Sequence, residues 1–329
     1  MVTKKEIAEK LGVSRATVSM VLNRKPRSRI SKKTAQKVFE MAQQMGYKEQ
    51  EDVEMQDLIC YILHNRGLEQ PSCLESLRAF ETATFEANMR TIITTVDRSS
   101  DDFYKLTNVL KSPGIKGAVV AGNFDRNLIK YIKSLDVPFV ANGVVDLEGI
   151  NLVSPDHHLA GLEATEFLIK QGHKKIAFFT GELNKLTHSK LLTGYREALE
   201  KHSLPYDTSL VQVSSLELGD ELVRRVEGLG VAYTAIITAN EQMGIDALIE
   251  LKSNGIAIPE EVSILAIGGG SFGAQSSPKL TVMGIDEEVM AGEILNLLVK
   301  NINEPRMEPK KVMVKNTITE RESTGPYHF

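Results

Sequence analysis

The fold is decided near the N-terminus by the stretch Ile7-Ala8-Glu9-Lys10-Leu11-Gly12-Val13-Ser14-Arg15-Ala16-Thr17-Val18-Ser19-Met20-Val21-Leu22-Asn23. It contains two short helical patterns that meet at Gly12, and the second pattern opens with the hydroxyl residue Ser14. Small, hydroxyl-bearing and basic side chains lie on the polar face of the second pattern. Two short helices joined by a tight turn predict a helix-turn-helix motif, which places its second helix in the major groove of DNA.

The ends of these helices follow from the side chains at their boundaries. Thr3 and Glu6 have capping-box spacing, so we expect the first helix to begin at about Lys4, and Gly12 should end it. Ser14 should cap the second helix. The inward residues of that helix are then Val18, Val21 and Leu22, and the outward residues near its N-terminus, where such helices touch base edges, are Arg15, Ala16, Thr17 and Ser19.

A third helix completes a small domain. It follows a basic loop that contains Arg24, Lys25, Arg27 and Arg29. Ser31 should cap this helix and Gly46 should stop it. Its apolar side consists of Ala35, Val38, Ala42 and Met45.

The charge of this domain distinguishes a DNA-binding domain from an ordinary helical bundle. Residues 1–48 carry 12 Lys and Arg against 3 Asp and Glu, a net charge of +9, which leaves −13 for the rest of the chain. The net charge of −4 for the whole chain hides this asymmetry. A basic head on an acidic body fits phosphate contact by the head and solubility of the body.

The same stretch resembles the headpiece of the lactose-repressor (LacI/GalR) family of bacterial transcription regulators. The resemblance is carried by Val2-Thr3, Ile7-Ala8, Gly12-Val13-Ser14, Thr17-Val18-Ser19, Leu22-Asn23, Ile30-Ser31, Thr34 and Gly46-Tyr47. It implies that DNA is faced by Thr3, Ser14, Arg15, Ala16, Thr17, Ser19, Asn23, Ser31, Thr34 and Tyr47, and we add Arg29 from the basic loop. Met20 departs from the family, which usually has a guanine-reading arginine there. Methionine cannot make that bidentate contact.

The length and composition of the chain favour a soluble protein of more than one domain. The chain has 329 residues, of which 42% are hydrophobic and 25% charged. We find no signal peptide and no apolar run of about 18 residues, so we expect a cytoplasmic protein without a membrane segment. Cys60 and Cys73 are too few for a disulfide framework or a metal cluster, and we expect both to be reduced and packed. No cofactor is indicated.

The linker at 49–57 is acidic. It holds five carboxylates and no basic residue. In the resembled family this segment is a hinge helix that enters the minor groove and folds on DNA, but its usual Pro-Asn, Ala and Leu are missing here. Carboxylates are repelled by phosphates, so we favour a flexible tether over a hinge helix.

From residue 58 onward, apolar runs of strand length alternate with helical patterns, which indicates βαβ units and an α/β fold with parallel sheets. The pattern restarts after a turn at 154–156, so we expect two lobes. A last strand at 311–317 should join the second lobe. The expected organisation is a headpiece at 1–48, a linker at 49–57, a first lobe at 58–154 with 284–308, and a second lobe at 155–283 with 309–329.

This part of the chain also resembles the family, through 172–177, 194–199, 255–264 and 321–323. The resemblance implies a core like that of periplasmic binding proteins, with a small effector held between the lobes. The usual sugar-binding charges are missing, because Leu191 replaces an arginine and Gly268-Gly269 replaces two aspartates. A free sugar is therefore disfavoured, and a less polar effector is expected. The candidate effector residues are His64, Gln70, Ser72, Asn142, Leu191, Asn240, Gly268 and Gly269. His64 is equally well explained as a packed structural histidine.

Other site chemistries find less support. Gly268-Gly269-Gly270 lacks the spacing of a phosphate-binding loop. His157 and His158 point about 100° apart on a helix, and no further metal ligand is spaced to join them. No nucleophile elbow or catalytic Cys/His pairing occurs, so we do not expect an enzyme.

The sequence thus predicts a dimeric transcription regulator, most simply a repressor, that reads a palindromic operator. A small effector or a partner protein would control it through the core. The alternative is an interaction or scaffold protein with weak DNA binding and no small-molecule effector. Tight DNA binding by the purified protein alone would favour the regulator.

Overall fold

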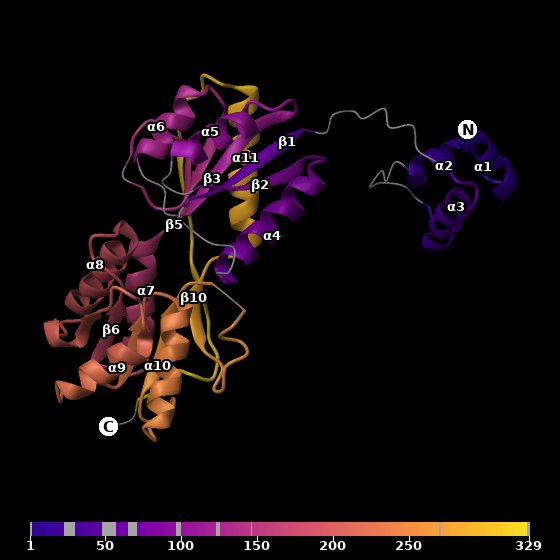
Figure 1. Ribbon diagram of the computed structural model, residues 1–329. Coiled ribbons are helices and arrows are strands. Elements are labelled where there is room, and N and C mark those ends of the chain that lie inside the picture. The colour runs from indigo at the N-terminus through magenta and orange to yellow at the C-terminus, as the bar shows by residue number, and fades with distance from the viewer. Residues whose placement is uncertain are drawn as a thin grey trace. The chain divides into compact units, whose positions relative to one another are not determined.

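The computed structural model describes residues 2–22, 30–47, 57–64, 71–96, 100–122, 126–145, 147–269 and 271–327, apart from the side chains of 32, 71, 72 and 100–102. The chain divides into two compact units, Met1–Met55 and Gln56–Phe329 (Figure 1). The acidic linker lies outside the described residues except for Asp57, so both hypotheses for it stay predictions.

The first unit is the expected headpiece of short helices: α1 (Lys4–Leu11), α2 (Arg15–Leu22) and α3 (Lys32–Gln44). The capping box is present in both directions, since the Glu6 N–H donates to Thr3 Oγ1 at 3.3 Å and the Thr3 N–H to Glu6 Oε2 at 2.7 Å. Gly12 ends α1 in the left-handed conformation at a φ of 65°. Ile7, Ala8, Val18, Val21, Val38 and Ala42 form the core of this unit.

The second unit consists of two lobes, each built on a six-stranded sheet. The first sheet has the order β11-β5-β4-β3-β1-β2 and all of its pairs are parallel. Its strands are β1 (Leu58–His64), β2 (Arg90–Val96), β3 (Ile115–Gly122), β4 (Phe139–Asn142), β5 (Leu152–Pro155) and β11 (Lys311–Val314). The helices of this lobe are α4 (Pro71–Glu86), α5 (Ser100–Leu110), α6 (Arg126–Ser134) and α11 (Glu287–Asn303).

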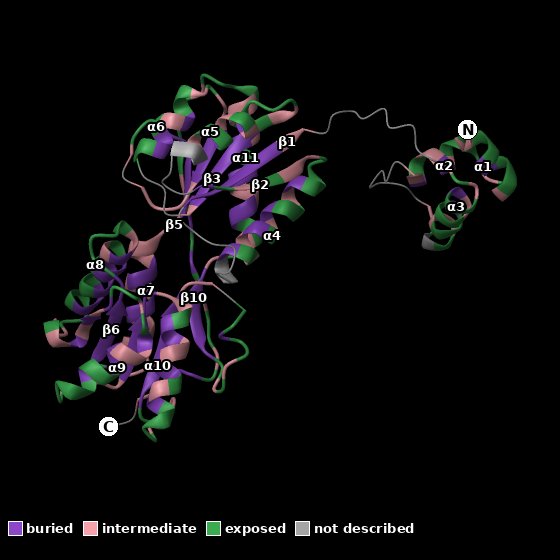
Figure 2. Ribbon diagram, in the orientation of Figure 1, coloured by how far each residue is buried: buried purple, intermediate pink, exposed green. Residues whose placement is uncertain are grey.

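Strand β1 shows why these strands read as continuous apolar runs. Ile59, Tyr61 and Leu63 belong to the core cluster that contains residues of α4 and α11. Cys60 and Ile62 belong to the cluster that contains residues of α5 and α6. Both faces of the strand are therefore buried under helices, as expected of a parallel sheet, and Figure 2 shows the buried strands between helices with exposed outer faces.

The second lobe repeats this arrangement with the strand order β12-β10-β9-β8-β6-β7, in which only β10 and β12 pair antiparallel. Its strands are β6 (Ile176–Thr180), β7 (Val211–Val213), β8 (Ala235–Thr238), β9 (Ser263–Ile267), β10 (Thr281–Gly284) and β12 (Thr317–Thr319). Its helices are α7 (His157–Lys170), α8 (Leu186–Lys201), α9 (Gly219–Gly228) and α10 (Glu241–Ser253), with a 3-10 turn at Thr208–Leu210. The expected α/β architecture is confirmed.

The C-terminal part of the chain corrects one prediction. The single strand expected at 311–317 in the second lobe is wrong, because β11 pairs with β5 in the first sheet and only β12 joins the second. Lys310 fixes the start of β11, since its carbonyl accepts from the Leu152 N–H at 2.8 Å and its own N–H donates to Asn151 Oδ1 at 2.9 Å. Residues up to Val314 thus belong with the first lobe. Strand β5 was also missed by the sequence analysis.

Helices α7 and α8 pack at backbone distance. A Cβ atom at Gly194 would lie 2.1 Å from the carbonyl oxygen of His158, and one at Gly161 would lie 2.2 Å from that of Leu191. No side chain fits at such distances, so two glycines are required for this helix pair.

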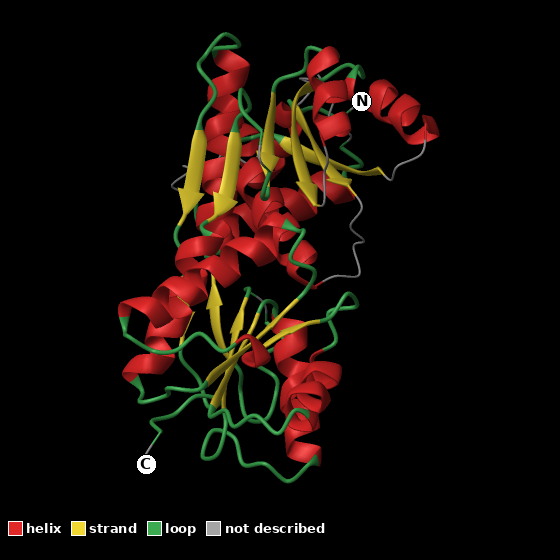
Figure 3. Ribbon diagram, turned by 90° about the vertical axis from the view of Figure 1, so that its left-hand side faces the viewer, coloured by secondary structure: helices red, strands yellow, loops and turns green. Residues whose placement is uncertain are grey.

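The strands of the two sheets point toward each other from opposite lobes in Figure 3, which places their carboxyl ends on either side of the region between the lobes. Ligands of parallel α/β sheets bind at such ends.

Candidate functional site

The first candidate site is the outer face of α2. Ser14, Arg15, Ala16 and Met20 are exposed, whereas Thr17 and Ser19 are half-buried. Ser14 caps the helix as expected, because its Oγ accepts from the Thr17 N–H at 3.0 Å. Val18 and Val21 are buried in the headpiece core. Helix α2 therefore presents its N-terminal polar residues to the outside, as a recognition helix must.

The other expected DNA-facing residues lie at helix ends. Ser31 is exposed and caps α3, where its Oγ accepts from the Thr34 N–H at 3.1 Å. Thr3 is exposed at the start of α1, and Tyr47 is half-buried against the headpiece core. Asn23 and Arg29 lie outside the described residues.

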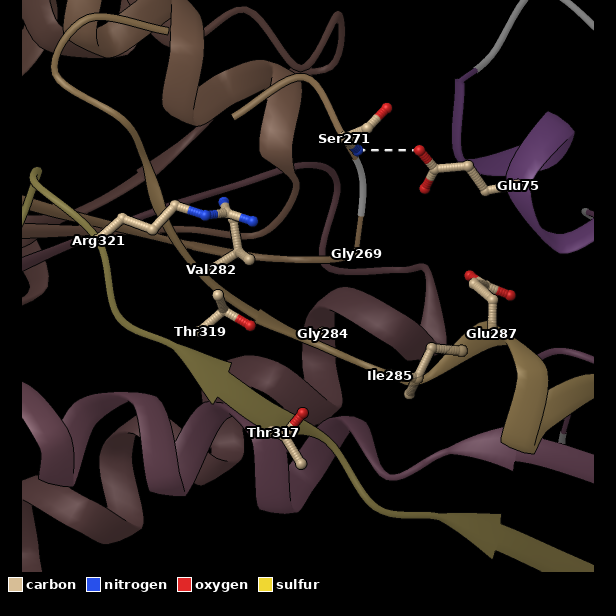
Figure 4. A pocket seen from close by; sticks show the side chains of 10 residues that line it. All are labelled: Glu75, Gly269, Ser271, Val282, Gly284, Ile285, Glu287, Thr317, Thr319 and Arg321. Carbon is tan, nitrogen blue, oxygen red and sulfur yellow. Dashed lines mark hydrogen bonds between the residues drawn. The ribbon is translucent and has the colours of Figure 1, made fainter. Parts of the chain in front are cut away.

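The second candidate site is a pocket between the lobes, which we call the interlobe pocket (Figure 4). Its volume is about 290 Å³. It is lined by Glu75, Gly269, Ser271, Val282, Gly284, Ile285, Glu287, Thr317, Thr319 and Arg321. Glu75 Oε1 accepts from the Ser271 N–H at 2.9 Å and so connects α4 of the first lobe with the loop after β9 of the second. Of the candidate effector residues, Gly269 lines this pocket directly.

The remaining candidates lie at the carboxyl ends of strands. His64 ends β1 and is only 1% exposed. Asn142 ends β4 and donates from Nδ2 to the Tyr61 hydroxyl at 3.2 Å. Asn240 caps α10, where its Oδ1 accepts from the Met243 N–H at 2.8 Å. Gly268 follows β9 with a φ of 133°, a backbone conformation that favours glycine. Gln70 and the side chain of Ser72 lie outside the described residues.

The prediction for Leu191 is wrong. Its side chain is 0% exposed and belongs to the core cluster of the second lobe. Its backbone is also pressed against Gly161 of the neighbouring helix. Because the side chain points into the core, it offers no surface to a ligand, and an apolar patch at this position does not exist in the structure.

A charged network beside Asn240 was not predicted from the sequence. Glu217 accepts from Asn240 Nδ2 at 2.9 Å through Oε2, while its Oε1 accepts from Lys185 Nζ at 2.9 Å and lies 3.7 Å from His188 Nε2. Burial lowers the pKa of His188. These residues come from the segments that follow β6, β7 and β8, and no local sequence signal connects them. Glu75, Glu287 and Arg321 of the interlobe pocket were missed for the same reason.

The start of α7 contains the histidine pair that the sequence left as a weak metal hypothesis. Asp156, and not a histidine, caps the helix by accepting from the Leu159 N–H at 3.0 Å. His158 is paired with Glu197 at 2.8 Å. Among the described residues no group of three His, Cys, Asp or Glu side chains is placed to hold a metal ion.

His157 should make stability depend on pH. Burial and, after it, the charge of Lys190 lower the pKa of His157 to about 4. Between about pH 6.5 and pH 4 the unfolded state then binds more protons than the folded state, so the free energy of unfolding falls as the pH falls. We expect this residue to contribute a loss of roughly 2 kcal/mol across that interval.

Urea unfolding of the wild type and of His157→Gln at a series of pH values measures this effect. The variant should show a smaller loss on acidification. Equal pH dependence in the wild type and His157→Gln would contradict the assignment.

Taken together, a helix-turn-helix headpiece and a two-lobed core with an interlobe pocket define a DNA-binding transcription regulator with a ligand-binding type of core. Family comparisons agree with this class. The description "Bacterial regulatory proteins, lacI family" matches residues 3–50, and "Periplasmic binding protein-like domain" matches residues 165–324. The chain therefore combines a LacI-family DNA-binding domain with a periplasmic-binding-protein-like domain, and the resemblance predicted from the sequence is confirmed.

The similarity to known regulators extends along nearly the whole chain. An HTH-type transcriptional regulator of Lachnoclostridium phytofermentans is 27% identical over 97% of this chain and 98% of its own length. Catabolite control protein A of Priestia megaterium is 26% identical over 98% of this chain and 99% of its own. A solved structure described as a transcriptional regulator CelR–cellobiose complex has a TM-score of 0.73 and 25% identity, and covers 98% of this chain and 100% of its own.

None of the helices in the described ranges is long and apolar enough to cross a bilayer.

Proposed function

We propose that this regulator is a repressor that binds a palindromic operator as a homodimer. The observation that carries the proposal is the exposed N-terminal face of α2, where Arg15 and its small and hydroxyl-bearing neighbours stand on a helix fixed by a buried opposite face. The proposed DNA-binding residues are Thr3, Ser14, Arg15, Ala16, Thr17, Ser19, Met20, Asn23, Arg29, Ser31, Thr34 and Tyr47. Such a protein acts in the cytoplasm, where the DNA is, and performs no catalysis.

The proposal of a dimer rests on the interface size that specific DNA binding needs and on one exposed apolar surface. A single headpiece offers little interface for specific affinity, and two-fold pairing doubles it. Strand β2 is an edge strand of the first sheet, and its Ile92 and Ile93 are exposed. Leu74 and Phe85 of the neighbouring helix α4 are about half-exposed. An apolar edge strand is open to association, so we assign this surface to a second copy of the chain.

Ile93→Glu should therefore shift the protein from dimer to monomer. A buried, unpaired carboxylate at a two-fold interface is present twice and opposes association. Sedimentation at micromolar concentration measures the change. Met313→Glu is the matched control, because Met313 is 48% exposed on β11 at the opposite edge of the same sheet. A wild-type protein that sediments as a monomer with and without DNA would contradict the dimer.

We further propose that the core controls DNA affinity through the region between the lobes. Asn142, Asn240, Gly268 and Gly269 lie at the carboxyl ends of strands from both lobes, where a ligand would contact both. The burial of His64 fits a packed structural histidine. The fold neighbour in complex with cellobiose supports a small-molecule effector for this type of core. A partner protein on the outside of the core is the second form of control. A protein that binds DNA only weakly when purified, and needs a partner for tight binding, would favour the scaffold alternative.

A further inference from the structure

The interlobe pocket has opposite charges at its two ends. Figure 4 shows the guanidinium of Arg321 on one side of the pocket and the carboxylates of Glu75 and Glu287 on the other. We propose that this pocket binds a small zwitterion, a molecule that carries both an ammonium group and a carboxylate. The inference rests on the proposed control of DNA binding by a core ligand and names the chemical class of that ligand.

The carboxylate end is held in place by protein hydrogen bonds. Glu75 Oε1 accepts from the Ser271 N–H at 2.9 Å, and Glu287 Oε2 accepts from the Ser76 hydroxyl at 2.8 Å. An ionised carboxylate has about four acceptor sites and can accept from several donors at once. Two oriented carboxylates at one end of a pocket fit an ammonium group, which carries three donors.

Glu241 adds a further carboxylate next to the pocket loop, where it accepts from the Gly273 N–H at 2.8 Å. It lies beside Arg321, since a Cβ atom at Gly273 would be 2.8 Å from Glu241 Oε1 and 3.4 Å from Arg321 Nη1. Burial and the nearby charge of Glu75 raise the pKa of Glu241, whereas the Gly273 N–H and the charge of Arg321 lower it.

The opposite end fits an anion. Arg321 Nη1 donates to the Leu280 carbonyl at 2.6 Å, which fixes the guanidinium beside β10. A guanidinium has five N–H donors in a planar fork that matches a carboxylate. The exposed hydroxyl residues Thr317 and Thr319 of β12 also line the pocket, and Thr319 lies below Arg321 in the view of Figure 4.

Glycines form the floor between the charged ends. A Cβ atom at Gly284 would lie 2.8 Å from the Cα atom of Gly269, so no side chain fits at Gly284. Gly268 and Gly269 present no side chain at the position where the family usually has sugar-binding aspartates, and the acidic groups come from α4 and α11 of the first lobe. A ligand with an ammonium group on the first lobe and a carboxylate on the second lobe would stabilise one spacing of the lobes.

The size of the pocket restricts the ligand further. A volume of about 290 Å³ is at the lower end of the range for small-molecule sites, which starts near roughly 300 Å³. A disaccharide is large for this volume and offers no charge to either end. An amino acid, or an ω-amino acid of similar length, fits both the size and the charges.

A thermal-shift comparison of the full-length protein tests the proposal with matched probes. 4-Aminobutyrate carries both charges, butylamine only the cation and butyrate only the anion. Alanine, 5-aminovalerate and 6-aminohexanoate vary the distance between the charges. At a hundredfold excess over its Kd, the best zwitterion should raise the unfolding midpoint by roughly 5 °C, whereas butylamine and butyrate should leave it nearly unchanged.

Variants locate the site. Glu287→Gln should weaken binding of the best zwitterion by about tenfold in calorimetric titration, because a charge-assisted hydrogen bond becomes a neutral one. Glu288→Gln, an exposed carboxylate one residue further along α11, should leave the affinity unchanged. If Glu287→Gln folds poorly, Glu75→Gln provides the second test, with the same loss expected.

Several outcomes would overturn the proposal: stabilisation by butylamine equal to that by the zwitterions, stabilisation by cellobiose alone, or equal affinities for Glu287→Gln and Glu288→Gln. DNA binding by the same preparations is measured in parallel. If it is intact while all zwitterions fail, only the ligand class is wrong. If DNA binding itself is missing, the proposed function fails.

Discussion

Arg15→Ala should lower the affinity for the selected operator by about tenfold to a hundredfold while changing the affinity for random DNA only slightly. The expected size is that of one bidentate contact to a base, about 1–3 kcal/mol. Arg15 is exposed in the first turn of α2, where recognition helices reach base edges, and Ser14 holds that turn by its cap. Titration of both DNAs at several salt concentrations measures the effect.

The salt dependence separates base reading from phosphate contact. If Arg15 contacts a phosphate instead, the variant should lose affinity for both DNAs alike and lower the salt slope by about 0.9. Lys10→Ala is the control, because Lys10 is an exposed basic residue in the last turn of α1 and not on the recognition helix. Equal losses on operator and random DNA for Arg15→Ala would contradict its role in base reading.

Gly194→Ala should destabilise the second lobe by about 3 kcal/mol, although alanine is the better helix former. The added Cβ atom would lie 2.1 Å from the His158 carbonyl oxygen and 2.6 Å from the Leu162 nitrogen. Both atoms belong to the backbone of α7, so the two helices must separate. Separation would also disturb Tyr195, which is 1% exposed and whose hydroxyl donates to the Ile176 carbonyl at 2.8 Å. Urea unfolding measures the loss.

The same substitution at a different glycine provides the control. Gly292 lies within α11, and a Cβ atom there would have no neighbour within 4 Å. Gly292→Ala should therefore stabilise the protein by about 0.5–1 kcal/mol, because only the backbone entropy changes. Changes of the same sign in the two variants would contradict the close packing of α7 and α8.

Local signals in the sequence were sufficient for the headpiece and for most of the core. The capping residues Thr3, Ser14 and Ser31 and the stop at Gly12 occur where they were expected, because each acts on its immediate neighbours. Strands such as β1 and β6 were predicted because both of their faces are buried, which gives long apolar runs.

Short strands were harder to predict. Strand β5 has only four residues and ends in Ser154-Pro155, which reads as a turn. Strands β11 and β12 are separated by Lys315 and Asn316, so the sequence reads as a single strand, and only pairing with β5 and β10 shows that the chain changes lobes there. Strand pairing is a long-range property that local patterns do not contain.

The candidate ligand site was predicted only in part. Flanking motifs locate Asn240, Gly268 and Gly269 in the chain, and of these Gly269 lines the interlobe pocket. Leu191 was misplaced because the loss of an arginine was taken to leave a surface, whereas an apolar side chain at that position turns into the core. Glu75, Glu287 and Arg321 are brought together from distant parts of the sequence, and no spacing rule connects them.

Selection of binding sites from random double-stranded DNA by the purified full-length protein, compared with its Met20→Arg variant, tests most directly that α2 reads an operator as part of a dimer. Met20 is 36% exposed on α2 and offers only apolar contact. The wild type should select an inverted repeat without guanine preference at the position that faces residue 20. Met20→Arg should acquire a guanine there with a preference of about 1–3 kcal/mol. Recovery of no common sequence, of a single unpaired half-site, or of the same guanine by both proteins would contradict the account.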